Sequence, residues 1–181
     1  MAYTNKVLTA PTMQIRFLQT AKDTKGKLLE MGTTYHSTTE KPPVHYHPYQ
    51  TEHFTIVNGE MTVIIDHKTQ VFKKGESFET TPGQSHAMWN ESGKDTIVLW
   101  KITPAMNSEN FFETINGLLA DGRPVNKGIK GLLQMSLTAN KFSPVFRLAK
   151  PPFFVQKVVF SILSPIAWLL GYRSMYQEYI D

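Results

Sequence analysis

The stretch HYHPYQTE, residues 45–52, decides how this sequence folds, together with GESFETTPGQSHAMWN, residues 75–90. The first stretch contributes His45, His47 and Glu52, and the second contributes His86. Imidazole nitrogens and a carboxylate are a donor set for one divalent metal ion. Turn glycines lie between the two stretches, so a single site requires a fold that brings them together.

Strand geometry predicts which of these side chains point the same way. Residues two apart on a strand share a face, so His45 and His47 project together if both lie on one strand. Pro48 cannot continue a ladder of hydrogen bonds, and the alternation can restart after it. Glu52 then points inward, in step with the apolar residues that follow it, whereas His53 points away. We therefore exclude His53 from the ligand set.

The region around these stretches has the pattern of an antiparallel β domain. From about Met13 to Thr103, short β-rich runs are separated by turn signals such as Asn58-Gly59, which is typical of a sandwich or small barrel. A further strand should begin at His86. The other predicted strands are Met13–Gln19, Lys27–Tyr35, Glu52–Val57, Glu60–Ile65, Gln70–Phe72, Ser77–Thr80 and Thr96–Thr103.

Helical patterns replace this alternation after Pro104. Ser108 is a candidate cap for a helix that Asp121-Gly122-Arg123-Pro124 terminates, and a second apolar segment surrounds Leu132–Leu137. Residues 142–152 resemble an extended connector. Phe153–Leu170 should form two short helices divided at Ser164-Pro165. We predict a β-barrel domain over residues 1–104 and a helical extension over residues 105–181.

Charge and cysteine content narrow the possible functions. The chain has no cysteine, which excludes disulfides, thiolate metal sites and thiol nucleophiles. The N-terminus is too polar for a secretory signal, so we expect a cytoplasmic protein. Residues 122–177 contain eight Lys and Arg and no acidic residue. These cations are dispersed among aliphatic residues, which favours an anionic partner other than nucleic acid.

Both stretches carry a family resemblance. His45-x-His47-x4-Glu52-x6-Gly59 resembles the first motif of the cupin superfamily, and Gly75-x7-Gly83-x2-His86-x3-Asn90 resembles its second. The resemblance implies a small antiparallel jelly-roll barrel with a metal near its centre. The implied ligands are His45, His47, Glu52 and His86. Thr39 and Thr81 depart from the motifs at turn positions, which affects local loop shape more than metal binding.

Two parts of the chain leave alternatives open. Several large side chains could line an apolar pocket or simply fill the core: Met31, Tyr35, Phe54, Phe78, Met88, Trp89 and Trp100. Tyr35 could also supply a proton donor. His36 and His67 should lie at the surface or in turns, with His36 a minor candidate for the rim of the site.

The basic tail over residues 122–177, which contains no Asp or Glu, has three interpretations. It could pack on the outside of the barrel or across a homodimer, lie on an anionic membrane surface, or, as the weakest alternative, span a membrane.

Two functional hypotheses follow for the site. The first is a metal-dependent enzyme, of the dioxygenase or the isomerase and lyase kind, acting on a small organic molecule. In it, one Fe, Mn, Ni, Cu or Zn ion is held by the four ligands, and Glu52 also acts as a base. The second is a non-catalytic module that binds a small ligand. No helix-turn-helix candidate precedes the barrel, which weakens a regulatory role.

Overall fold

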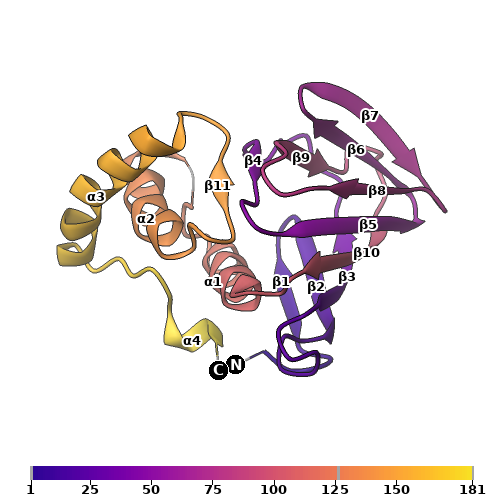
Figure 1. Cartoon of the computed structure of the whole chain (residues 1–181), viewed down its shortest axis with the longest axis horizontal. Helices are drawn as coiled ribbons and strands as arrows, with labels where there is room; N and C mark the ends of the chain where they lie inside the picture. The colour runs from indigo at the N-terminus through magenta and orange to yellow at the C-terminus, as the bar shows by residue number, and fades with distance from the viewer. Residues whose placement is uncertain (1, 126, 181) are drawn as a thin grey trace.

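The computed structural model describes residues 2–125 and 127–180, and its larger part is a β domain of two antiparallel sheets (Figure 1). The first sheet has the order β1-β2-β3-β10-β5-β8, and the second has the order β11-β4-β9-β6-β7. The strands of the first sheet are β1 (Val7–Ala10), β2 (Met13–Gln19), β3 (Leu29–Tyr35), β5 (Thr51–Asn58), β8 (Ser77–Thr80) and β10 (Thr96–Thr103). The strands of the second sheet are β4 (His45–Tyr46), β6 (Glu60–Ile65), β7 (Lys68–Lys73), β9 (His86–Trp89) and β11 (Arg147–Leu148).

The predicted antiparallel β architecture is therefore confirmed. Strands β2, β6, β8 and β10 have the predicted bounds, β3 begins two residues later than predicted, and β5 and β7 are one or two residues longer at each end. Strands β1 and β11 are additions. Closure into a jelly-roll barrel stays a prediction, as does the domain boundary at residue 104.

A hydrophobic core lies between the two sheets, and alternation along the strands builds it. In β5, Glu52, Phe54 and Ile56 are buried while the intervening residues are more exposed. Met61 and Val63 of β6 belong to the same core cluster. Gly59 has φ +84, and an added Cβ would come within 2.6 Å of the Thr96 hydroxyl. The hairpin between β5 and β6 thus requires glycine at this position.

Four helices follow the β domain. They are α1 (Ser108–Ala120), α2 (Gly128–Lys141), α3 (Phe153–Leu169) and α4 (Gln177–Ile180). Helix α1 connects two cores, because Phe112 belongs to the core of the β domain while Phe111 packs against a second cluster. That second cluster contains Met135, Phe146 and Phe160. Helix α3 lies on the side of α2 that faces away from the β domain (Figure 1).

Two details of the helical prediction are wrong. Ser108 does not cap α1, since Asn107 holds the cap position and the Ser108 hydroxyl accepts a hydrogen bond from Gln50 Nε2 at 2.8 Å. Residues 153–169 form one helix with Pro165 inside it. Asn140 of α2 donates a hydrogen bond of 2.9 Å to the Ser164 hydroxyl beside this proline. Packing of α3 along α2 therefore holds both halves in line despite the missing backbone donor.

The sequence led us to expect that the tail packs on the outside of the β domain. In the structure, the tail also contributes a strand to the second sheet. Within the segment predicted as a connector, β11 pairs with β4 in the second sheet. Within the described residues, no helix has the length and apolarity needed to cross a membrane.

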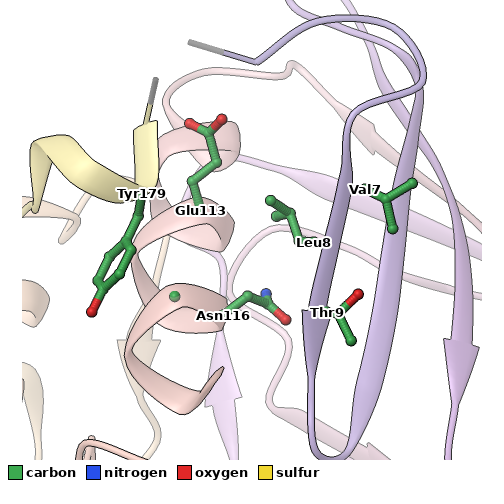
Figure 2. A pocket seen from close by; sticks show the side chains of 7 residues that line it. Val7, Leu8, Thr9, Glu113, Asn116 and Tyr179 are labelled. Carbon is green, nitrogen blue, oxygen red and sulfur yellow. The ribbon is translucent and has the colours of Figure 1, made fainter. Parts of the chain in front are cut away.

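The N- and C-terminal segments meet at α1 in a small hollow of about 190 Å³ (Figure 2). It is lined by residues of β1, α1 and the α4 residue Tyr179. An added Cβ on Gly117 would lie 2.2 Å from the Tyr179 ring, so only glycine allows this approach. None of the four predicted ligands lines the hollow, and we regard it as a packing feature.

Candidate metal centre

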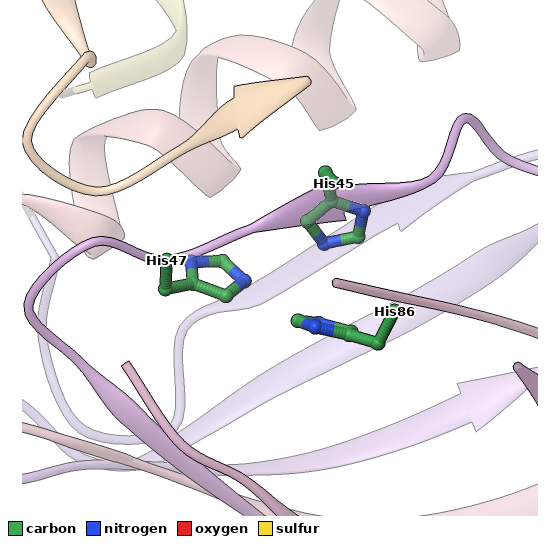
Figure 3. A group of neighbouring side chains, drawn as sticks. All are labelled: His45, His47 and His86. Atoms are coloured by element: carbon green, nitrogen blue, oxygen red, sulfur yellow. The ribbon is translucent and has the colours of Figure 1, made fainter. Parts of the chain in front are cut away.

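Three histidines converge at one end of the space between the sheets (Figure 3). One ring nitrogen from each of His45, His47 and His86 lies within 4.8 Å of the others. His45 of β4 and His86 of β9 are cross-strand partners. His47 lies just beyond the end of β4, so one strand does not carry both His45 and His47. The chain turns at Pro48 after His47, yet the two imidazoles still face the same centre.

Glu52 reaches this centre from the opposite sheet. Its Oε2 atom lies 3.0 Å from Nε2 of His47 and 2.9 Å from Nε2 of His86. The carboxylate is fully buried and also accepts hydrogen bonds from Thr80 Oγ1, at 3.3 Å, and from Trp100 Nε1, at 3.2 Å. The fold therefore brings together all four predicted residues. Whether Glu52 is itself a ligand stays a prediction.

The second nitrogen of each imidazole faces a backbone carbonyl. Nδ1 of His45 lies 3.0 Å from the Pro43 oxygen, and Nδ1 of His86 lies 3.1 Å from the Gln84 oxygen. Nδ1 of His47 faces the oxygen of Val145, in the segment between α2 and β11. A carbonyl oxygen can only accept, so each Nδ1 carries the proton and each Nε2 presents a lone pair to the centre. Carbonyl acceptors of this kind orient the histidines of metal sites.

The pKa shifts of His45, His47 and Glu52 are compatible with a bound cation at this centre. Burial lowers the pKa of His45 to about 3, with the charges of His86 and His47 acting in the same direction. Burial opposes ionisation of Glu52, yet the neighbouring histidines hold the pKa of its carboxyl well below the usual value. Burial also opposes protonation of His47, but the charge of Glu52 raises the pKa of His47. The centre thus contains an ionised carboxylate that requires positive charge beside it.

One buried atom tests whether these residues fit a metal. Nε2 of His47 is near Glu52 but is not aligned for a hydrogen bond, and it has no other partner among the described residues. An unpaired buried nitrogen is costly. Two ligands bound at right angles, each about 2.1 Å from one ion, lie roughly 3.0 Å apart. The separations between Glu52 and the two Nε2 atoms match this spacing, so the residues fit a divalent ion.

A cavity of about 500 Å³ opens beside the three histidines. Seventeen of its lining residues come from the β domain and nine from the extension. The large apolar and aromatic side chains from the β domain are Met13, Tyr35, Phe54, Met88, Trp89 and Trp100. Those from the extension are Phe111, Phe112, Ile115, Leu119, Val125, Met135 and Phe146. The volume is that of a small-molecule site.

Five of the seven pocket candidates from the sequence line this cavity, whereas Met31 and Phe78 are not among its lining residues. Met31 is fully buried in the core, and Phe78 stacks on Phe54 with ring centroids 4.7 Å apart. The Tyr35 hydroxyl lies 3.9 Å from the Met88 sulfur. Burial and the charge of Glu52 raise the pKa of Tyr35, so its proton is held tightly.

The other histidines lie outside the cluster. His36 lines the cavity and its Nδ1 lies 3.1 Å from an Asp95 carboxylate oxygen. This agrees with the minor alternative for His36, a place at the rim of the site. His53 pairs with Lys101 and Glu79 across the ladder, on the outward side of β5. His67 has φ 70 and lies in the turn before β7.

The extension holds the functional features that sequence reasoning missed. The Val145 carbonyl contacts His47, and the Phe146 ring lies 4.9 Å from the His45 ring. Side chains from α1 and α2 line part of the cavity. The only sequence signal for this role was the density of phenylalanines in residues 111–146, which is equally typical of an ordinary core.

Comparisons with known proteins match the β domain rather than the extension. Residues 33–102 match the family model described as a cupin domain. A protein of Arthrobotrys oligospora that is named as an oxidoreductase is 31% identical over 74 residues, which are 40% of this chain and 29% of that protein. This chain therefore spans less than a third of that relative's length.

Two solved structures share the fold. An RmlC-like cupin from Shewanella frigidimarina has a TM-score of 0.50 and 19% identity, covering 58% of this chain and 88% of its own. KdgF from a Halomonas species has a TM-score of 0.50 and 13% identity, covering 57% and 92%. At such low identity, the likeness shows the fold alone.

Proposed function

We propose that this chain, whose residues 33–102 match the cupin-domain family model, is a metal-dependent enzyme acting on a small, largely apolar organic molecule. The observation that carries the proposal is the convergence of three imidazoles and a buried carboxylate beside a cavity that the three histidines line. His45, His47, Glu52 and His86 would hold the ion. Four protein ligands leave one or two positions open on a five- or six-coordinate ion.

The ion would supply Lewis acidity toward a substrate oxygen, and Fe, Mn, Ni or Cu would add one-electron chemistry. The chain's own residues bind and orient. The carbonyls of residues 43, 84 and 145 hold the imidazoles in one tautomer. The aromatic walls select an apolar body and exclude water, so that only the polar end of a substrate faces the histidines.

Glu52 is better suited to binding the ion than to proton transfer. Two donors, Thr80 and Trp100, hold its oxygens, and its lowered pKa makes it a weak base. This restraint favours our second candidate function, a module that binds a small ligand at the metal without turnover. The predicted role of Glu52 as a base stays a prediction.

Turnover separates the two candidates. Metal-reconstituted protein is tested for oxygen uptake and product formation over a panel of phenols, diketones and small organic acids. We expect consumption of at least one apolar, oxygen-bearing compound, and its loss in the double variant His47→Ala, His86→Ala. The matched control is His53→Ala, which removes an imidazole from the outward side of β5. Consumption that the double variant retains would contradict a metal-dependent reaction, and binding without consumption would favour the second candidate.

A further inference from the structure

Helix α3 has two apolar faces, and the protein covers one of them. Gln156, Phe160 and Ala167 are buried, and α3 packs against α2. Their spacing of four and seven residues follows one side of a helix. The remaining circumference of α3 points away from the rest of the chain (Figure 1).

The uncovered face is unusually apolar. Nine large apolar side chains between residues 154 and 170 are exposed, among them Phe154 at 77%, Ile162 at 63% and Leu169 at 77%. Scattered exposed apolar residues are normal, but a contiguous helical face of this kind marks an interaction surface. We call it the α3 outer face, meaning the exposed apolar side chains of residues 154–170.

Basic residues flank the α3 outer face at both ends of the helix. It lies within residues 122–177, which contain eight basic and no acidic residues. Cations sit on aromatic rings at both ends of the helix. The Arg147 guanidinium lies 3.7 Å from the centre of the Phe153 ring, and that of Arg173 lies 5.4 Å from the Trp168 ring. Lys157 adds an exposed ammonium group along the helix.

This combination matches the boundary of an anionic bilayer. Apolar side chains insert below the headgroups, while aromatic and basic residues remain at headgroup level beside the phosphates. Because the other face of α3 is packed on α2, the helix can bury its outer face only by lying flat on the membrane. We propose that the α3 outer face docks this protein on an anionic lipid surface, an inference independent of the metal chemistry.

Charge argues against a second copy as the occupant. A two-fold interface would place the α3 outer face against itself. Both surfaces would then present cations without acidic partners from residues 122–177, and like charges across an interface are unfavourable. An anionic lipid surface supplies the missing negative charge.

Vesicle co-sedimentation of the full chain tests this proposal. One vesicle preparation contains phosphatidylcholine with about a third phosphatidylglycerol, and the other contains phosphatidylcholine alone. We expect binding to the mixed vesicles to be roughly tenfold stronger than to the neutral ones, and to weaken as salt is raised. The double variant Ile162→Asp, Leu169→Asp should lose binding at least about tenfold. The control Val57→Asp, Val71→Asp alters two exposed apolar residues of the β domain and should bind as the parent does.

A charge-reversed variant, Lys150→Glu with Lys157→Glu, keeps the apolar face and should still lose the preference for anionic vesicles. Circular dichroism checks that each variant is folded. The proposal is overturned if the parent does not bind mixed vesicles. It is also overturned if Ile162→Asp, Leu169→Asp and Lys150→Glu, Lys157→Glu both bind them as the parent does. It is also overturned if sedimentation shows a dimer that Ile162→Asp, Leu169→Asp dissociates while vesicle binding is unchanged.

Discussion

The β domain and the helical extension contribute different chemistry to the same centre. The β domain supplies the three imidazoles and the carboxylate of the candidate metal centre, those of His45, His47, His86 and Glu52. The extension supplies apolar wall and one carbonyl, that of Val145, which orients His47. The difference indicates that the candidate metal ligands all come from the β domain, whereas the extension completes the wall of the cavity.

The β domain was easier to predict from the sequence than the extension. Alternation along a strand is a local pattern with a period of two, so it correctly separated Glu52 from His53 and gave the bounds of β2, β6, β8 and β10. The pairing of β11 with β4 could not be foreseen in the same way. It joins residues about a hundred positions apart, and only the packing of α1 and α2 brings them together.

Helix α3 shows the same limit for a different reason. Proline at position 165 is a local signal for a helix end, and that signal was outweighed by packing on α2 and the hydrogen bond between Asn140 and Ser164. Phe146 lies in the segment that the sequence predicts as a connector. Its position beside the rings of His45 and Phe111 depends on tertiary contacts that no local pattern encodes.

The largest effect on stability should come from Phe146→Ala, which removes the aromatic contact between the extension and His45. Phe146 is 7% exposed and lies 4.9 Å from the His45 ring and 5.1 Å from the Phe111 ring. We expect a loss of about 3–5 kcal/mol in the free energy of unfolding, from transfer and cavity terms. Metal affinity should also fall roughly tenfold, because the neighbouring Val145 carbonyl shifts from His47. Chemical denaturation measures the free energy of unfolding, and titration calorimetry measures the metal affinity. Unchanged metal affinity would show that the extension packs on the centre without orienting its histidines.

The second prediction is a loss of metal affinity on substitution of Glu52 in the β domain. Glu52→Gln keeps the size of the side chain but removes its charge, so we expect metal affinity to fall by about 10–100-fold or more. The control is Glu79→Gln on β8, an exposed residue that is the ladder partner of His53. Equal metal affinity in Glu52→Gln and the parent would remove Glu52 from the ligand set.

Acid should weaken the centre through the β-domain residues. The folded chain keeps His45 neutral down to about pH 3, while the unfolded chain protonates it below 6.5. His45 therefore makes folding less favourable as pH falls between these values. Glu52 has a lowered pKa, so its contribution is present above 4.5 and is lost as pH falls through its folded value. The raised pKa of His47 acts oppositely, adding stability below 6.5 that is lost as pH rises through its folded value.

Metal affinity should fall below about pH 6, because protons compete for imidazoles that bind metal only when neutral. His47 should be the first to compete, since its pKa is raised. Calorimetric titrations at a series of pH values measure this. Affinity that stays flat from about pH 8 to about pH 5 would contradict binding by three histidines.

The smallest effect should come from the ion pair that links the two regions at the rim of the cavity. Lys127 Nζ lies 2.7 Å from Glu40 Oε1, with the side chains 71% and 66% exposed. Exposed pairs contribute little, so Lys127→Ala should change the free energy of unfolding by less than about 1 kcal/mol. Thermal unfolding at low and high salt provides the measurement. A larger effect would mean that this contact, rather than the apolar wall, holds the extension on the β domain.

Elemental analysis of the natively expressed protein tests the central claim most directly. We predict about one first-row divalent ion for each chain. The ion should be retained in His53→Ala and lost in the double variant His47→Ala, His86→Ala. Protein that binds no such ion, even after incubation with each candidate metal, would contradict the proposed centre, as would a metal content that the double variant leaves unchanged.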